Sequence, residues 1–277
     1  MTTAWVFRGG GSLGAAQVGM ARALLEAGRR PDLLFGTSAG AFNAAWLAYD
    51  PSLEGLGTLA NLWNALRRQV VFPFNPLTIL SGLAGLRDHA VNPRPFARWV
   101  RAVTPLRRIE DGELPVAFVA TDIQTGEEVL LRTGPMVPAL LASSAIPGIF
   151  PPVRIGGKWL VDGGVATDTP IGHAFNAGAS EVWVLPCSPD DRLFMARPRS
   201  VLGTLLNSSA IMVARQSAES VARWSRLCDV FVLPAPRLPG VSAFDFNHSK
   251  ELIDAGHDAS ARWLKDARPV AATASRQ

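Results

Sequence analysis

The sequence predicts an α/β fold built on a mostly parallel β-sheet. Near the N-terminus, an apolar run, a glycine-containing turn and an apolar helical pattern follow one another, and this unit occurs twice. The first unit is a strand over residues 5–7 and a helix over 13–27, which Gly28 ends. The second is a strand over 33–36 and a helix over 39–49. Repeated strand–helix units place their strands in one parallel sheet.

The rest of the chain continues this alternation. Further strands are expected over residues 116–121, 128–131, 158–161, 181–185 and 229–233. Further helices are expected over 53–68, 137–145, 171–177 and 249–265, with one or two over 200–227 and two short pieces before 103. The pattern predicts a single domain over 1–267, with its motifs in about 4–178, and a mobile tail over 268–277.

Composition narrows the class of protein. Apolar residues make up 48% of the chain and charged residues 18%, which is typical of a globular protein with a filled core. Two cysteines, Cys187 and Cys228, are too few for a disulfide framework or a cysteine-rich zinc site. No signal peptide or membrane span is apparent, so a cytoplasmic protein is expected, with contact at the inner membrane surface left open. The basic residues are scattered, and no nucleic-acid partner is expected.

The second glycine-bounded turn, Gly36-Thr37-Ser38-Ala39-Gly40, has the pattern of a nucleophile turn. Gly36 and Gly40 let the backbone turn sharply between a strand and a helix. Ser38 would then lie at the N-terminus of that helix, where the helix dipole favours developing negative charge. A serine that only caps the helix is the alternative. The strand before it and the helix after it favour Ser38 as a nucleophile.

The first turn, Gly9-Gly10-Gly11-Ser12-Leu13-Gly14, follows the first predicted strand. Consecutive backbone N–H groups in such a loop bind an anion or an oxyanion, and Gly10 and Gly11 are the preferred donors. The spacing also fits a dinucleotide-binding fingerprint, with Asp32 about twenty residues on. In that fingerprint the acidic residue ends the second strand, whereas Asp32 precedes it. The oxyanion interpretation is therefore favoured.

A third motif, Asp162-Gly163-Gly164, follows a predicted strand more than a hundred residues later. A strand end can direct a carboxylate towards a neighbouring turn, and burial would raise the proton affinity of Asp162 enough for it to act as a base on Ser38. An aspartate that only bonds its own turn is the alternative.

A Ser-His-Asp triad is the other arrangement to consider. Its candidate bases are the four histidines, His89, His173, His248 and His257. None has a neighbourhood typical of a catalytic histidine. The nucleophile also comes very early in the chain, where only one strand precedes it to carry the oxyanion hole. The sequence favours a Ser-Asp dyad.

The three motifs, in this order, resemble those of the patatin-like phospholipases. The run Ala142-Ser143-Ser144-Ala145-Ile146-Pro147-Gly148-Ile149-Phe150-Pro151-Pro152 is similar to the segment that precedes the family's dyad aspartate. The resemblance implies a three-layer fold, a Ser38–Asp162 dyad, an oxyanion hole from the amides of Gly10, Gly11 and Ser12, and no metal or organic cofactor. The implied reaction is hydrolysis of lipid acyl esters, of phospholipase A type, through an acyl-serine. Leu13 departs from the family, in which many members carry Arg or Lys there.

Two other functions use the same fold. A catalytically weak lipid- or acyl-binding regulator would keep the fold without a reactive Ser38. An acyltransferase would use the same dyad and pass the acyl group to an alcohol. The lipid head group, the chain length and the oligomeric state are not predicted. An apolar set that could form an acyl pocket lies between the second and third motifs: Trp63, Phe72, Phe74, Leu77, Ile79, Leu80, Leu83 and Leu86.

Overall fold

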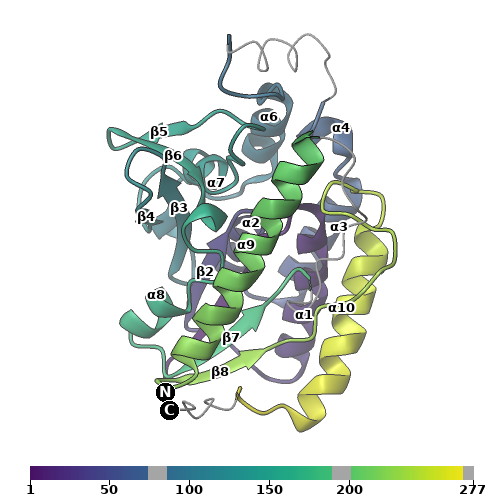
Figure 1. The fold of residues 1–277 in the computed structure, drawn as a ribbon. Helices are drawn as coiled ribbons and strands as arrows, with labels where there is room; N and C mark the ends of the chain where they lie inside the picture. The colour runs from purple at the N-terminus through teal and green to yellow at the C-terminus, as the bar shows by residue number, and fades with distance from the viewer. Residues whose placement is uncertain (74–85, 189–200, 271–277) are drawn as a thin grey trace.

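The computed structural model describes residues 1–73, 86–188 and 201–270 (Figure 1). Its main helices and strands are, in chain order, β1 (Thr3–Phe7), α1 (Ala15–Glu26), β2 (Leu33–Thr37), α2 (Ala39–Tyr49), α3 (Leu53–Ala65), α4 (Arg68–Val71), α6 (Arg94–Val103), β3 (Val116–Asp122), β4 (Glu128–Leu131), α7 (Met136–Ser143), β5 (Val153–Ile155), β6 (Lys158–Asp162), α8 (Ile171–Asn176), β7 (Glu181–Leu185), α9 (Val201–Trp224), β8 (Asp229–Val232) and α10 (Ser249–Trp263).

The strands form one sheet in the order β5-β6-β3-β2-β1-β7-β8, and β4 also pairs with β3. The five strands β3, β2, β1, β7 and β8 pair in parallel. The remaining strands, β4, β5 and β6, pair antiparallel. The predicted α/β fold with a mostly parallel sheet is therefore confirmed. The short strand β5 was not predicted, because its three residues are too few to show an alternating pattern.

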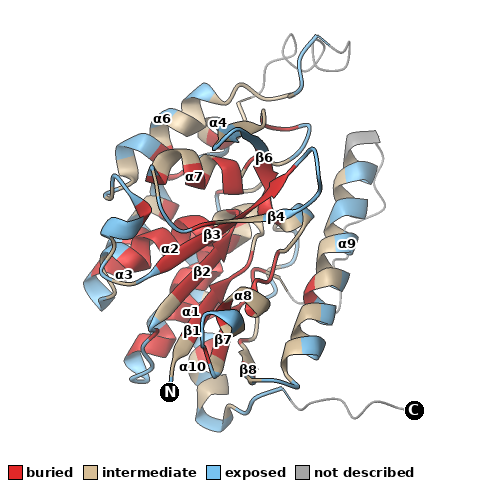
Figure 2. Cartoon of the chain, turned by 90° about the vertical axis from the view of Figure 1, so that its left-hand side faces the viewer, coloured by how far each residue is buried: buried red, intermediate tan, exposed pale blue. Residues whose placement is uncertain are grey.

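Side chains alternate between two cores, one on each face of the sheet. In β1, Trp5 and Phe7 pack into a large cluster with α1, α2, α3 and α7. Ala4 and Val6 point the other way, into a smaller cluster with α8 and α9. Both views show helices on the two sides of the sheet, α9 on one and α1, α3 and α10 on the other (Figures 1 and 2). The result is a three-layer arrangement.

Most predicted elements match the observed ones. The segment for which one or two helices were expected contains the single helix α9 within the described residues. Of the two short helical pieces, α6 is the one the structure describes. Residues 74–85, including Phe74, Leu77, Ile79, Leu80 and Leu83, lie outside the described residues, as do 271–277 of the predicted tail.

Helices α1 and α10 make a close contact through glycines. A Cβ atom added to Gly19 would lie 1.9 Å from the Ile253 carbonyl oxygen, and one added to Gly256 would lie 2.3 Å from the Ala16 carbonyl oxygen. Both neighbours are backbone atoms, which cannot turn away as a side chain would. This contact depends on the absence of side chains at both positions.

We therefore expect Gly19→Ala and Gly256→Ala to destabilise the protein by about 1–3 kcal/mol each, because the helices must move apart. Gly57→Ala is the matched control, because Gly57 lies in α3 with no atom within 4 Å of an added Cβ. There alanine should stabilise the helix by about 0.5–1 kcal/mol. Urea unfolding of the three variants measures the difference, and equal effects at all three positions would contradict the close-packing argument.

Candidate active site

Ser38 is the single residue between β2 and α2. Its backbone has φ 55° and ψ −123°, and it alone among the described non-glycine residues has a positive φ. The turn fits because Gly40 approaches the end of β1, where an added Cβ would lie 2.2 Å from the Phe7 carbonyl oxygen. The structure thus places Ser38 at the N-terminus of α2, as the motif predicts.

A buried serine from α7 holds this turn. The Ser38 N–H donates to the Ser143 hydroxyl over 3.0 Å, and that hydroxyl donates to the Val119 carbonyl oxygen of β3 over 2.6 Å. Ser143 has no exposed surface. Sequence reasoning gave Ser143 no role beyond its place in a family-like run, because a side chain that bonds backbone far along the chain leaves no local pattern.

Asp162 ends β6 and pairs with Ala120 in the middle of β3. Its carboxylate accepts a hydrogen bond from the Ser38 side chain and one of 2.8 Å from the Gly164 N–H. The carbonyl oxygen of Asp162 accepts from the Thr121 hydroxyl over 3.0 Å. Ser38 and Asp162 are both buried, with 8% and 7% of their surfaces exposed. The structure brings the two predicted residues into direct contact.

The environment of Asp162 changes its acidity. Burial raises the pKa of its carboxyl from 3.8 to about 7, because the charged form loses hydration. The hydrogen bonds from Ser38 and Gly164 lower this pKa, and the nearby charge of Asp168 raises it further. A carboxylate with a pKa near neutrality can both accept and return a proton.

The glycine loop leads into the same site. The amides of Gly10 and Gly11 have no hydrogen-bond partner within the described part of the chain. Gly11, at φ 57°, lines a pocket together with Ser38. Ser12 differs from the prediction, because its N–H donates to the Ala243 carbonyl oxygen over 2.9 Å and its hydroxyl to that of Ser242. The Ser12 amide is therefore already bonded, which leaves two of the three predicted donors available.

A buried ion pair supports the start of this loop. The Arg8 guanidinium contacts the Asp168 carboxylate at 2.8 Å, with 6% and 2% of these side chains exposed. The other Asp168 oxygen accepts the Gly9 N–H over 2.9 Å, and Ser217 of α9 donates to the carboxylate over 3.1 Å. Asp168 was missed because its partners, apart from Ser217, lie about 160 residues away. The sequence feature that could have identified it is its position, as an acidic residue shortly after the Asp162 motif.

A second buried network lies beneath the loop. The Gln17 amide nitrogen donates to the carbonyl oxygens of Arg8 and Leu185, at 2.8 and 2.7 Å. Asn43 donates to the Gln17 side-chain oxygen, and the Trp63 indole donates to Asn43, each over 2.8 Å. Because buried polar groups are costly unless bonded, this network fixes the relative positions of α1, α2 and α3 around the loop.

An apolar pocket adjoins Ser38. Several aromatic rings in its wall contact one another, including Phe42 with Trp99 and Phe96 with Phe150, whose centroids lie 5.2 and 5.5 Å apart. Its lining beyond Gly11 and Ser38 is Ala39, Phe42, Trp63, Leu66, Val71, Phe72, Phe96, Trp99, Val100, Leu140, Ser144, Ile146, Phe150 and Phe246. The structure thus places Trp63 and Phe72 of the predicted apolar set in the pocket, whereas Leu86 is 79% exposed.

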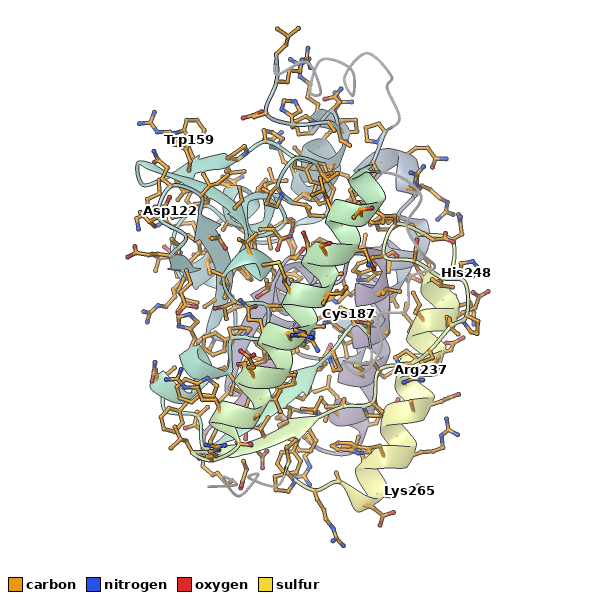
Figure 3. The ribbon with its side chains drawn as sticks, viewed as in Figure 1. Asp122, Trp159, Cys187, Arg237, His248 and Lys265 are labelled. Carbon is orange, nitrogen blue, oxygen red and sulfur yellow. The ribbon has the colours of Figure 1, made fainter. Side chains whose placement is uncertain are left out.

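The alternatives to a Ser-Asp pair lie elsewhere. The four histidines, all within the described residues, each lie within ion-pair distance of a carboxylate, and none lines the pocket. His248, for example, lies at the surface near the start of α10 (Figure 3). Asp32 accepts the Thr3 N–H over 2.8 Å at the first residue of β1, opposite the end that leads into the glycine loop. No group of three metal-binding side chains occurs among the described residues.

Asp162 should reduce stability at neutral pH. Its pKa is about 7 in the fold and near 3.8 when unfolded, so its ionisation opposes folding above pH 7, and this penalty disappears as the pH falls towards 4. We expect Asp162→Asn to unfold at a higher temperature at pH 8, with a gain of up to a few kcal/mol that shrinks below pH 7. Thermal unfolding from pH 4 to 8 tests this. Exposed Asp266→Asn is the control, and an equal or lower melting temperature for Asp162→Asn at pH 8 would contradict the prediction.

Known proteins are similar in sequence to this chain. The human patatin-like phospholipase domain-containing protein 6 is 31% identical over 194 residues, which are 69% of this chain and 14% of the human protein. An NTE family protein of Mycobacterium tuberculosis is 36% identical over 175 residues, covering 60% of this chain and 27% of the relative. This chain therefore spans less than a third of the length of either relative.

A solved structure and a family model also match this chain. The crystal structure of VipD from Legionella pneumophila aligns with a TM-score of 0.48 and 14% identity, covering 95% of this chain and 66% of that one. The family model for patatin-like phospholipases matches residues 5–175, which include Ser38, Asp162 and the glycine loop. Because this match covers more than half of its residues, the chain belongs to the patatin-like phospholipase family.

Proposed function

We propose that this chain hydrolyses acyl esters of lipids through an acyl-serine intermediate, with Ser38 as the nucleophile and Asp162 as its base. The observation that carries the proposal is the hydrogen bond from the Ser38 side chain to a buried carboxylate, beside an apolar pocket. Membership of the patatin-like phospholipase family supports a lipid substrate.

The first half of the reaction forms the acyl-enzyme. Asp162 accepts the Ser38 hydroxyl proton while the serine oxygen attacks the ester carbonyl carbon. The negative charge that develops on the carbonyl oxygen is stabilised by the amides of Gly10 and Gly11, which have no other partner among the described residues. As the ester C–O bond breaks, protonated Asp162 returns the proton to the leaving alkoxide.

The second half releases the acyl group. Water takes the place of the departed alcohol, Asp162 accepts one of its protons, and the hydroxide attacks the acyl-serine carbonyl. Collapse of the second tetrahedral intermediate returns the proton to Ser38 and releases the fatty acid. An acyltransferase would differ only in the nucleophile of this step, which would be an alcohol.

The pocket and the loop indicate how a substrate would bind. The acyl chain would lie among the aromatic side chains of the pocket, where its burial contributes about 0.8 kcal/mol per methylene. Leu13 is packed against the main core, so this position offers no charge to a phosphorylated head group. No helix in the described part of the chain is long and apolar enough to cross a membrane.

The proposal is tested by labelling with a fluorophosphonate probe and by turnover of p-nitrophenyl acyl esters. We expect Ser38→Ala to lose labelling, and both Ser38→Ala and Asp162→Asn to lose at least about a thousandfold in turnover. Exposed Ser209→Ala, a change in α9, should label as the wild type does. If the wild-type protein is neither labelled nor able to hydrolyse any of these esters, the hydrolase proposal is contradicted and a lipid-binding regulator is favoured.

The pH dependence reports on Asp162. We expect kcat/KM for a soluble ester to rise with pH around a midpoint near 7, because Asp162 must be ionised to act as a base. Asp168→Asn should move this midpoint to lower pH, since the charge of Asp168 raises the Asp162 pKa and the variant removes that charge.

A second variant separates charge from position. Asp168→Asn keeps an oxygen that can accept the Gly9 N–H, whereas Asp168→Ala removes it. We expect kcat to be about tenfold lower in Asp168→Ala than in Asp168→Asn, because the oxyanion loop loses its anchor. Identical pH profiles for wild type and Asp168→Asn would show that Asp168 has only a structural role.

A further inference from the structure

Helix α6 presents two different faces. Phe96, Trp99 and Val100 line the pocket that contains Ser38. Arg94, Arg98 and Arg101 are all exposed and follow one another at intervals of four and three residues. At about 100° per residue, these intervals place the arginines on one side of the helix and the pocket residues on the opposite side. One helix therefore forms an apolar wall inside and a cationic surface outside.

The positive charge of the whole chain is concentrated here. Residues 86–108 contain six arginines and one acidic residue, Asp88, for a net charge of +5, whereas the entire chain carries +4. The rest of the sequence is thus close to neutral, at −1. The pattern was missed in the sequence because these arginines occur singly or as one pair, and only the helix brings three of them together.

The arginines of α6 lack an acidic partner among the residues that the structure describes. No carboxylate in the described part of the chain lies within ion-pair distance of Arg94, Arg98 or Arg101. Asp88, the acidic residue of the segment, contacts His89 instead. Like charges on one helix face repel one another by a few tenths of a kcal/mol per pair unless an anion lies between them. The surface is therefore complementary to a negatively charged partner.

The place of this surface favours a bilayer as that partner. Helix α6 lies at one end of the molecule, and the N-terminus and the C-terminal end of α10 lie at the other (Figure 1). Two exposed apolar side chains accompany the arginines. Leu86 begins the same segment, and half-exposed Trp159 of β6 lies towards the same end (Figure 3). Arginines together with exposed Leu and Trp side chains are typical of the interface with an anionic membrane.

We propose that the outer face of α6, formed by Arg94, Arg98 and Arg101, docks the protein on an anionic lipid surface. The choice of lipid over another polyanion rests on the proposed lipid hydrolase function. Docking through this helix would place the opposite, pocket-lining face one helix diameter from the bilayer, about 10 Å. The substrate would then reach the pocket from the surface to which the enzyme is already bound.

Vesicle sedimentation tests the proposal in a Ser38→Ala background, where lipid is not consumed and binding does not depend on turnover. The vesicles are phosphatidylcholine alone or phosphatidylcholine with phosphatidylglycerol. We expect binding only to the anionic vesicles, and its loss on raising the salt from 0.05 to 0.5 M, at roughly a Debye length of 4 Å. A charge near an anionic surface contributes about fivefold to binding, so replacing all three arginines by glutamine should weaken it about a hundredfold.

The matched control changes three exposed arginines at the other end of the molecule. Arg226→Gln, Arg262→Gln and Arg268→Gln together alter the net charge equally, near the ends of α9 and α10. This control should retain binding within about threefold. Circular dichroism of both triple variants confirms that each is folded.

Three results would overturn the proposal. They are equal losses in the two triple variants, equal binding to neutral and anionic vesicles, and no binding of the parent protein to either. If the parent formed a dimer that the α6 variant dissociated, with no vesicle binding, this face would be an interface between copies instead. None of these results bears on whether Ser38 is a nucleophile, which the labelling experiment decides separately.

Discussion

The strained backbone at Ser38 is the constraint around which the rest of the site is arranged. A non-glycine residue with φ 55° and ψ −123° costs about 1–3 kcal/mol, so its surroundings must hold it in place. Ser143 accepts its amide, and Gly40 lets the first turn of α2 lie against the end of β1. Because the glycine loop follows β1, the same contact brings the proposed oxyanion donors close to Ser38.

Two buried aspartates close to one another have different partners, and the difference separates their proposed roles. Asp168 contacts the Arg8 guanidinium and accepts a hydrogen bond from the Gly9 amide, so its carboxylate is held in place beneath the loop. Within the described part of the chain, the donors to the Asp162 carboxylate are the Ser38 hydroxyl and a backbone amide, and burial keeps its pKa near neutrality. A catalytic base must be able to accept and release a proton near the working pH, whereas a residue that positions a loop must keep its bonding partner.

The sequence predicted most of the strands and helices and the three motifs, because each depends on residues close together in the chain. Short apolar runs predicted β1 and β2, a helical pattern predicted α2, and glycine spacing predicted the two turns. Ser143, Asp168 and Gln17 were missed because each bonds backbone atoms of distant segments. The prediction for Ser12 failed for the same reason, since its amide partner, Ala243, lies beyond the end of β8. Pairings of this kind follow only from the folded arrangement.

Helices α6 and α10 differ in the charges on their exposed sides, and solubility alone does not account for the arginine face of α6. The exposed side of α10 mixes signs, with Lys250 bonded to Asp254 and His257 to Glu26 of α1. Such mixing keeps a surface hydrated without internal repulsion. Helix α6 needs a polar outer side as well, because its inner side is committed to the pocket. Its outer side carries three positive charges instead. Their mutual repulsion favours a state in which the face binds an external anion over one in which it is exposed only to water.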